Sequence, residues 1–157
     1  MFGRILIPLD GSKLAECALP CAEELAKGCN TEQIVLVSVT ERITGYQAMD
    51  DPSHPLGQRL APVGVGKKEK QAQRYLGKIA KALEAKGIRV RTEVLIGNPA
   101  EEIAIFAKYN EIDLIVMSSH GRSGPSRWAY GSVADKTFRA SHAPVLMVKA
   151  PGCLTGI

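Results

Sequence analysis

The residues best suited to chemistry lie in one stretch, SSHGRSGPSRWAYGS, which begins at Ser118. Gly121 and Gly124 permit close backbone approach and positive φ, so successive N–H groups there could bind an anion. Gly131 and Ser132 open a predicted helix, and the N-terminus of a helix favours phosphate. The hydroxyl of Ser132 and the two arginines of the stretch could add hydrogen bonds and charge. These residue types together indicate a phosphate site.

A second polar group follows the first apolar run of the chain, Ile5–Leu9. Asp10 lies directly after this run, and a carboxylate there suits a ribose hydroxyl or a metal-bound water. In open α/β sheets, ligands bind outside the carboxyl ends of strands, where the winding reverses. If the run Ile5–Leu9 and the run Leu114–Ser118 form neighbouring central strands, the two polar loops face each other across one crevice.

Plainer structural interpretations account for the same residues and stay open at this point. Ser132 with Asp135 three positions later fits a capping box that only starts a helix. The glycines could serve simply to turn the chain, and the whole role of Asp10 could be to cap the first helix. His120 is better interpreted as a structural loop residue than as a catalytic base.

Apolar runs that alternate with helical patterns indicate the elements that position these loops. Alternation of this kind predicts an α/β fold with a five-stranded parallel, doubly wound sheet and helices on both faces, Rossmann-like. One run, 88–96, alternates apolar with charged residues and is expected at an edge. Pro20 should kink the first helix. The predicted strands are 5–9, 34–39, 88–96, 114–118 and 145–149, and the predicted helices are 13–27, 67–86, 99–109 and 132–140.

The length of 157 residues suits a single domain, which we place at residues 1–150. Residues 40–66 contain several Pro and Gly without a clear period, and we expect a long mobile loop there. Residues 151–157 are expected to be a C-terminal tail.

Composition and motifs together argue against several classes of protein. No apolar stretch approaches the length of a membrane span, and the N-terminus lacks the features of a signal peptide, so we expect a cytoplasmic protein without membrane contact. The net charge of +4 is mild and the basic residues are dispersed, which does not suit a nucleic-acid partner. The sequence contains no GxxxxGK[ST], GxSxG or HExxH motif, and no catalytic residue or metal ligand is assigned.

The chain resembles the universal stress protein family over nearly its whole length. The resemblance rests on ILIPLDGS at the start, GNPAEEI in the middle, MSSHGRSG after the fourth predicted strand, GSVADK at the last helix and HAPVLMVK near the end. It implies the strand order 3-2-1-4-5, which makes the first and fourth strands neighbours. It also implies a homodimer in which strand Val145–Lys149 pairs with its twin, so that an edge strand gains a partner.

The resemblance further implies the ATP-binding subclass, whose motif is Gly, two residues, Gly, nine residues, then Gly and Ser or Thr. Gly121 takes the second glycine position, Gly131 and Ser132 close the motif, and Ser118 stands where the first glycine would be. Residues and resemblance together predict a nucleotide-binding site of Pro8, Leu9, Asp10, Val39, Met117, Ser118, His120, Gly121, Arg122, Gly124, Gly131, Ser132 and Val133.

The predicted function is an ATP-binding universal stress protein that acts as a nucleotide-dependent stress-response or regulatory module. ATP, with or without Mg²⁺, is the expected cofactor, and hydrolysis is expected to be slow or absent. One alternative is an ATP-hydrolysing enzyme. The other is a dimeric interaction module without nucleotide.

Overall fold

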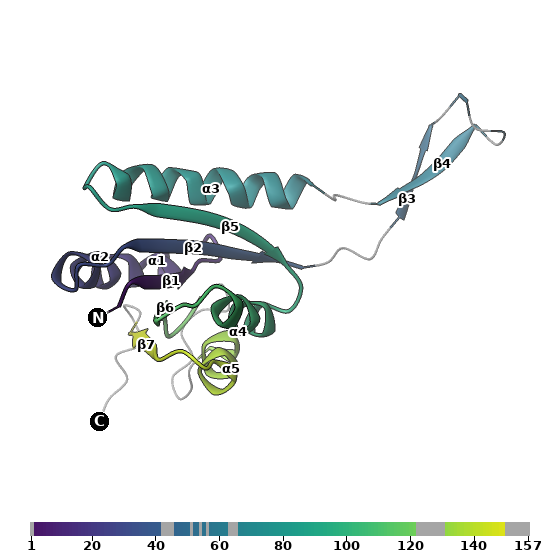
Figure 1. Cartoon of the computed structure of the whole chain (residues 1–157). Helices are drawn as coiled ribbons and strands as arrows, with labels where there is room; N and C mark the ends of the chain where they lie inside the picture. The colour runs from purple at the N-terminus through teal and green to yellow at the C-terminus, as the bar shows by residue number, and fades with distance from the viewer. Residues whose placement is uncertain are drawn as a thin grey trace.

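The computed structural model describes residues 2–41, 46–50, 52–53, 55, 57–62, 66–121 and 131–149. Its main element is a five-stranded sheet in the order β5-β2-β1-β6-β7 (Figure 1). The strands of this sheet are β1 Arg4–Pro8, β2 Gln33–Thr40, β5 Val90–Ile96, β6 Leu114–Ser118 and β7 Val145–Val148. The helices are α1 Lys13–Glu16, α2 Ala18–Gly28, α3 Lys67–Glu84, α4 Pro99–Tyr109 and α5 Ser132–Ala140.

The sheet is parallel throughout, and its winding reverses between β1 and β6. β1 pairs with β2, with Ile7 opposite Leu36, and on its other side with β6, with Leu6 opposite Ile115. This arrangement confirms the predicted α/β fold and the order 3-2-1-4-5, counted over the five predicted strands. Both faces of β1 are buried, which explains its continuous apolar sequence.

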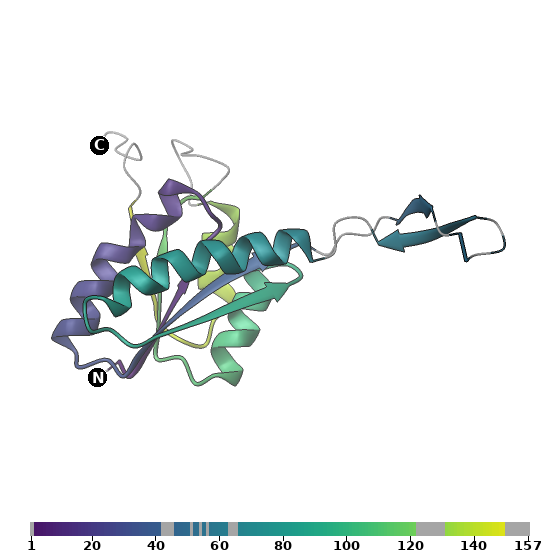
Figure 2. The ribbon, with the colours of Figure 1, turned by 90° about the horizontal axis from the view of Figure 1, so that it is seen from above.

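Helices cover both faces of the sheet (Figures 1 and 2), and an apolar core lies on each face. On one face, Ile7 and Leu36 pack with Leu76 of α3, and residues of α1 and α2 complete this core. On the other face, Leu6 packs with Ile103 of α4 and with residues of α5. The chain therefore crosses from one face to the other between β5 and β6, and this crossing creates the reversal of the winding.

The first predicted helix is interrupted at Cys17, so that α1 and α2 replace one helix over 13–27. Pro20 has no N–H to donate to the carbonyl of Glu16, and its ring crowds that carbonyl. The predicted kink is confirmed and takes the form of a break. Ser12 caps α1, because its Oγ accepts a hydrogen bond of 3.1 Å from the N–H of Ala15.

The segment 40–66 contains two short antiparallel strands that the sequence did not predict. β3 Tyr46–Asp50 pairs with β4 Gln58–Pro62 in a separate sheet, with Ala48 opposite Leu60. In Figure 1 this hairpin lies beyond the N-terminal end of α3. Neither YQAMD nor QRLAP alternates apolar with polar residues regularly, so periodicity does not predict these two strands. The predicted mobility of this segment falls partly, and the predicted tail at 151–157 wholly, outside the described residues.

Within the described ranges, none of the helices combines the length and the apolar character needed to cross a membrane.

Candidate functional site

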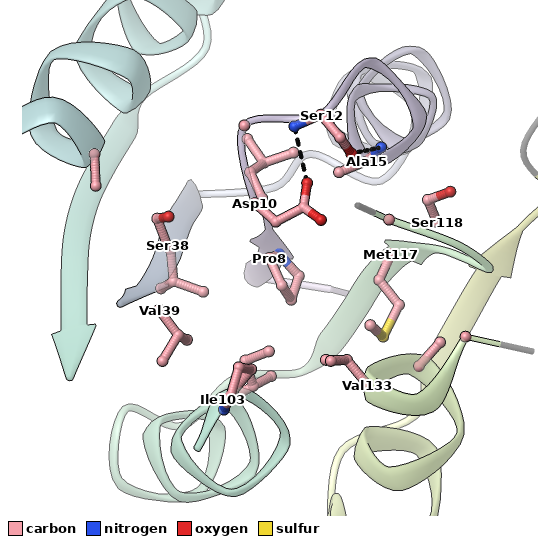
Figure 3. A pocket seen from close by; sticks show the side chains of 18 of the residues that line it. Pro8, Asp10, Ser12, Ala15, Ser38, Val39, Ile103, Met117, Ser118 and Val133 are labelled. Atoms are coloured by element: carbon pink, nitrogen blue, oxygen red, sulfur yellow. Dashed lines mark hydrogen bonds between the residues drawn. The ribbon is translucent and has the colours of Figure 1, made fainter. Parts of the chain in front are cut away.

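A crevice of about 730 Å³ opens at the carboxyl ends of β1, β2 and β6, where the winding reverses (Figure 3). The ends of α1, α4 and α5 border it together with one side of α3. All predicted site residues that the structure describes line this crevice, although they come from distant parts of the chain. They are Pro8, Leu9, Asp10, Val39, Met117, Ser118, His120, Gly121, Gly131, Ser132 and Val133. The other two, Arg122 and Gly124, lie outside the described residues.

Asp10 organises the loop that follows β1. Its Oδ1 accepts a hydrogen bond of 2.9 Å from the N–H of Ser12, and the side chain points into the crevice (Figure 3). Ser12 in turn supplies the cap of α1. The interpretation of Asp10 as only a helix cap is therefore wrong, because Asp10 fixes the turn one step before the cap.

Gly121 gives the Asp10 carboxylate its space. A Cβ atom built on Gly121 would collide with Oδ2 of Asp10. Gly121 is not among the glycines with positive φ, so of the two properties that glycine permits here, the structure uses close backbone approach. This glycine is needed because two loops from neighbouring strands pack closely, and a larger residue would push the carboxylate away.

The end of β6 accommodates a serine where the family motif has glycine. Ser118 is 6% exposed, and its Oγ accepts a hydrogen bond of 3.4 Å from the N–H of His120. Ser118 does not have a positive φ, so a serine fits without backbone strain. His120 is also 6% exposed, and its Nδ1 lies 3.0 Å from the hydroxyl oxygen of Ser119, as expected for a structural loop residue.

The N-terminus of α5 faces the crevice without a side-chain cap. Gly131 is the N-cap residue, and Ser132 is the first residue of the helix. Asp135 forms an ion pair of 3.0 Å with Arg139 instead of a hydrogen bond to the helix start, so the capping-box interpretation is wrong. The first residues of α5, Ser132 to Ala134, line the crevice. Their N–H groups have no acceptor within the helix and therefore suit an anion.

Several lining residues were not predicted. Pro99 and Ile103 belong to α4, which follows β5 at the same edge of the sheet, so their position after a strand was a usable signal. Lys68 and Tyr75 of α3 also line the crevice. No sequence signal could find them, because the position of α3 along the sheet depends on its tertiary packing.

Tyr75 joins α3 to α1 beside the crevice. Its hydroxyl donates a hydrogen bond of 3.2 Å to Oε1 of Glu16, and Oε2 of Glu16 pairs with Lys13 at 2.7 Å. Burial raises the pKa of the Tyr75 phenol above its ordinary range, and the negative charges of Glu16 and Asp10 raise it further. The phenol therefore stays protonated and remains a donor.

The fold and the crevice define a small doubly wound α/β domain with a crevice at its switch point. The chain belongs to the universal stress protein family, whose sequence model matches residues 1–149. It is 35% identical over 153 residues to universal stress protein MJ0531 of Methanocaldococcus jannaschii, covering 96% of this chain and 84% of that protein. It is 32% identical to universal stress protein YxiE of Bacillus subtilis, covering 95% of this chain and 100% of that protein. The solved structure of MJ0577, also of Methanocaldococcus jannaschii, superposes with a TM-score of 0.78 at 28% identity, covering 97% and 99% of the two chains.

The contact between Asp10 and Gly121 predicts the effect of a methyl group. Gly121→Ala should displace the carboxylate, change the amide chemical shift of Ser12 and lower the free energy of unfolding by about 1–3 kcal/mol. Gly77→Ala is the control, because a Cβ there meets no atom within 4 Å. It should raise stability by roughly 0.5–1 kcal/mol, as expected for glycine in a helix interior. An unchanged Ser12 resonance in Gly121→Ala would contradict the contact.

The raised pKa of Tyr75 predicts a pH dependence of stability. In the unfolded chain Tyr75 loses its phenolic proton at about pH 10, whereas in the folded chain Tyr75 keeps this proton to a higher pH. The stabilisation from Tyr75 is therefore complete below that pH and is lost as the pH rises above it. Urea unfolding between neutral and strongly alkaline pH should show a shallower decline in Tyr75→Phe than in the wild type. Tyr109→Phe, at a residue that is 78% exposed, should retain the wild-type slope.

Proposed function

We propose that this universal stress protein binds ATP in the crevice and acts as a nucleotide-dependent stress-response module. The observation that supports the proposal most is the arrangement of α5, whose uncapped N-terminus borders the same crevice as the Asp10 carboxylate. The N–H groups at the start of α5 suit phosphates, and the carboxylate of Asp10 suits a ribose hydroxyl. The proposal assigns the binding roles to the residues predicted from the sequence.

The glycines around the crevice fit a ligand that approaches the backbone closely. A Cβ on Gly131 would lie 3.2 Å from the carbonyl oxygen of Ser119 and 3.5 Å from the Cα of His120. A side chain at this position would therefore disturb the loop or enter the space beside the N-terminus of α5. ATP brings its own negative charge, and Mg²⁺ would be held mainly by the phosphates. Among the described residues, no group of His, Cys, Asp and Glu is arranged to hold a metal ion alone.

Two solved universal stress proteins of the same fold are complexes with adenine nucleotides. One contains cAMP, with a TM-score of 0.68 and 19% identity, and the other, from Arabidopsis thaliana, contains AMP, with a TM-score of 0.63 and 16% identity. These likenesses concern the fold. They are compatible with an adenine nucleotide in the present crevice, and the choice of ATP rests on the family motif.

We propose slow or absent hydrolysis. The side chain of His120 is buried and its Nδ1 lies 3.0 Å from the hydroxyl oxygen of Ser119, so the imidazole is held by the loop and we assign it no role as a catalytic base. We place the module in the cytoplasm, an interpretation that rests on the sequence. Rapid release of phosphate from ATP by the purified protein would contradict the binding module and favour an enzyme.

Calorimetric titration with ATP tests the proposed binding. The wild type should bind saturably, and Gly131→Val should raise the dissociation constant at least about tenfold, because its branched side chain crowds the loop and the helix start. Gly28→Ala is the control, since a Cβ there meets no atom within 4 Å. Thermal unfolding of each variant confirms that it is folded. The absence of heat in the wild type, or equal affinity in Gly131→Val, would overturn the proposal.

We further propose a homodimer through the edge strand β7. β7 is last in the strand order, and Leu146 on it is 37% exposed. Pairing with a second copy would satisfy the outer edge of the strand. In sedimentation experiments Leu146→Lys should shift the protein toward monomer, whereas Ile105→Lys on α4, where the residue is 50% exposed, should remain dimeric. A monomeric wild type would refute this assembly.

A further inference from the structure

The wall that α3 contributes to the crevice is separate from the residues that the family motif assigns. Lys68, Gln71, Ala72 and Tyr75 line the crevice from this helix, and we call these four residues the α3 face. Their spacing places them on one side of a helix. In Figure 3, α3 lies on the other side of Asp10 from α4 and α5. A ligand that fills the crevice therefore meets the α3 face as a further wall.

The α3 face has a fixed position. Tyr75 is hydrogen-bonded to Glu16 of α1 at 3.2 Å, and Leu76, the next residue, is fully buried against the sheet. Lys68 lies two turns before Tyr75, near the start of the same helix. The backbone of Lys68 is thus held beside the crevice, while its exposed side chain keeps the freedom to reach a ligand.

The charges around the crevice give Lys68 a particular importance. Among the lining residues that the structure describes, Asp10 and Glu41 are carboxylates, and Lys68 is the one lysine or arginine. No described carboxylate forms an ion pair with Lys68, whereas Lys13 and Lys27 both have such partners. A phosphate chain that enters this crevice meets two negative charges, and within the described residues one full positive charge is available to offset them.

We propose that Lys68 is the charge-selecting residue of the crevice. Its ammonium group pairs with the phosphate chain of the bound nucleotide, so the site favours nucleotides with an anionic tail over nucleosides. A charge-assisted hydrogen bond from the Lys68 ammonium to a phosphate oxygen is stronger than a hydrogen bond between neutral groups. The inference rests on the nucleotide binding proposed above, and it adds a residue of α3 to a site built from β1, β6 and α5.

Titrations with ATP and with adenosine test the inference. Lys68→Ala should raise the dissociation constant for ATP roughly tenfold or more. The same variant should change the dissociation constant for adenosine by less than about twofold, because the nucleoside has no charge for Lys68 to pair with. Lys68→Arg should retain most of the ATP affinity. Lys70→Ala is the matched control, since Lys70 is an exposed lysine of the same helix that does not line the crevice. The ATP affinity of Lys68→Ala should also depend less on salt concentration than that of the wild type.

The outcomes separate this inference from the proposal on which it rests. If the wild type binds ATP, and Lys68→Ala weakens ATP binding no more than Lys70→Ala does, the role of Lys68 is refuted and the proposal of nucleotide binding stands. Equal losses for ATP and adenosine in Lys68→Ala would also refute it, because they would indicate a disturbed crevice instead of a lost charge pair. If the wild type binds neither compound, both proposals fail.

Discussion

The packing of the Asp10 carboxylate against Gly121 is the contact on which the crevice depends. The two residues follow β1 and β6, and they meet because these strands are neighbours at the point where the winding reverses. Oδ1 of Asp10 holds the N–H of Ser12, which then caps α1. The Oδ2 side leaves no room for a side chain at position 121. One carboxylate therefore sets both the start of a helix and the distance between two loops.

The opposite side of the crevice is fixed by backbone hydrogen bonds. The N–H of Gly131 donates to the carbonyl of Ser119 at 2.8 Å, and the N–H of Ser119 donates to the carbonyl of Val148 at 2.8 Å. The start of α5 is thereby held to the end of β6 and to the edge strand β7. Its first N–H groups, which have no acceptor within the helix, therefore have a fixed orientation, and a preorganised site reduces the entropy that a ligand loses on binding.

The sequence was sufficient for the five strands of the main sheet and for many of the residues that line the crevice, because buried parallel strands have continuous apolar runs and ligand loops follow their carboxyl ends. It was insufficient where tertiary packing decides. The hairpin of β3 and β4 has no strong sequence pattern of its own. The spacing of Ser132 and Asp135 fits a capping box, but in the folded chain Asp135 forms an ion pair with Arg139. The α3 face could not be predicted, because nothing in its local sequence specifies how far the helix reaches along the sheet.

The central claim is that an adenine nucleotide occupies the crevice at the switch point, and amide chemical shifts followed during an ATP titration test it most directly. The account predicts saturable shifts at Ser12, Gly121 and Ser132. It predicts no shifts around a second hollow of about 440 Å³, which Asn30 and Arg89 line with other residues. Saturable shifts confined to that second hollow, or no shifts at any ATP concentration, would contradict the account.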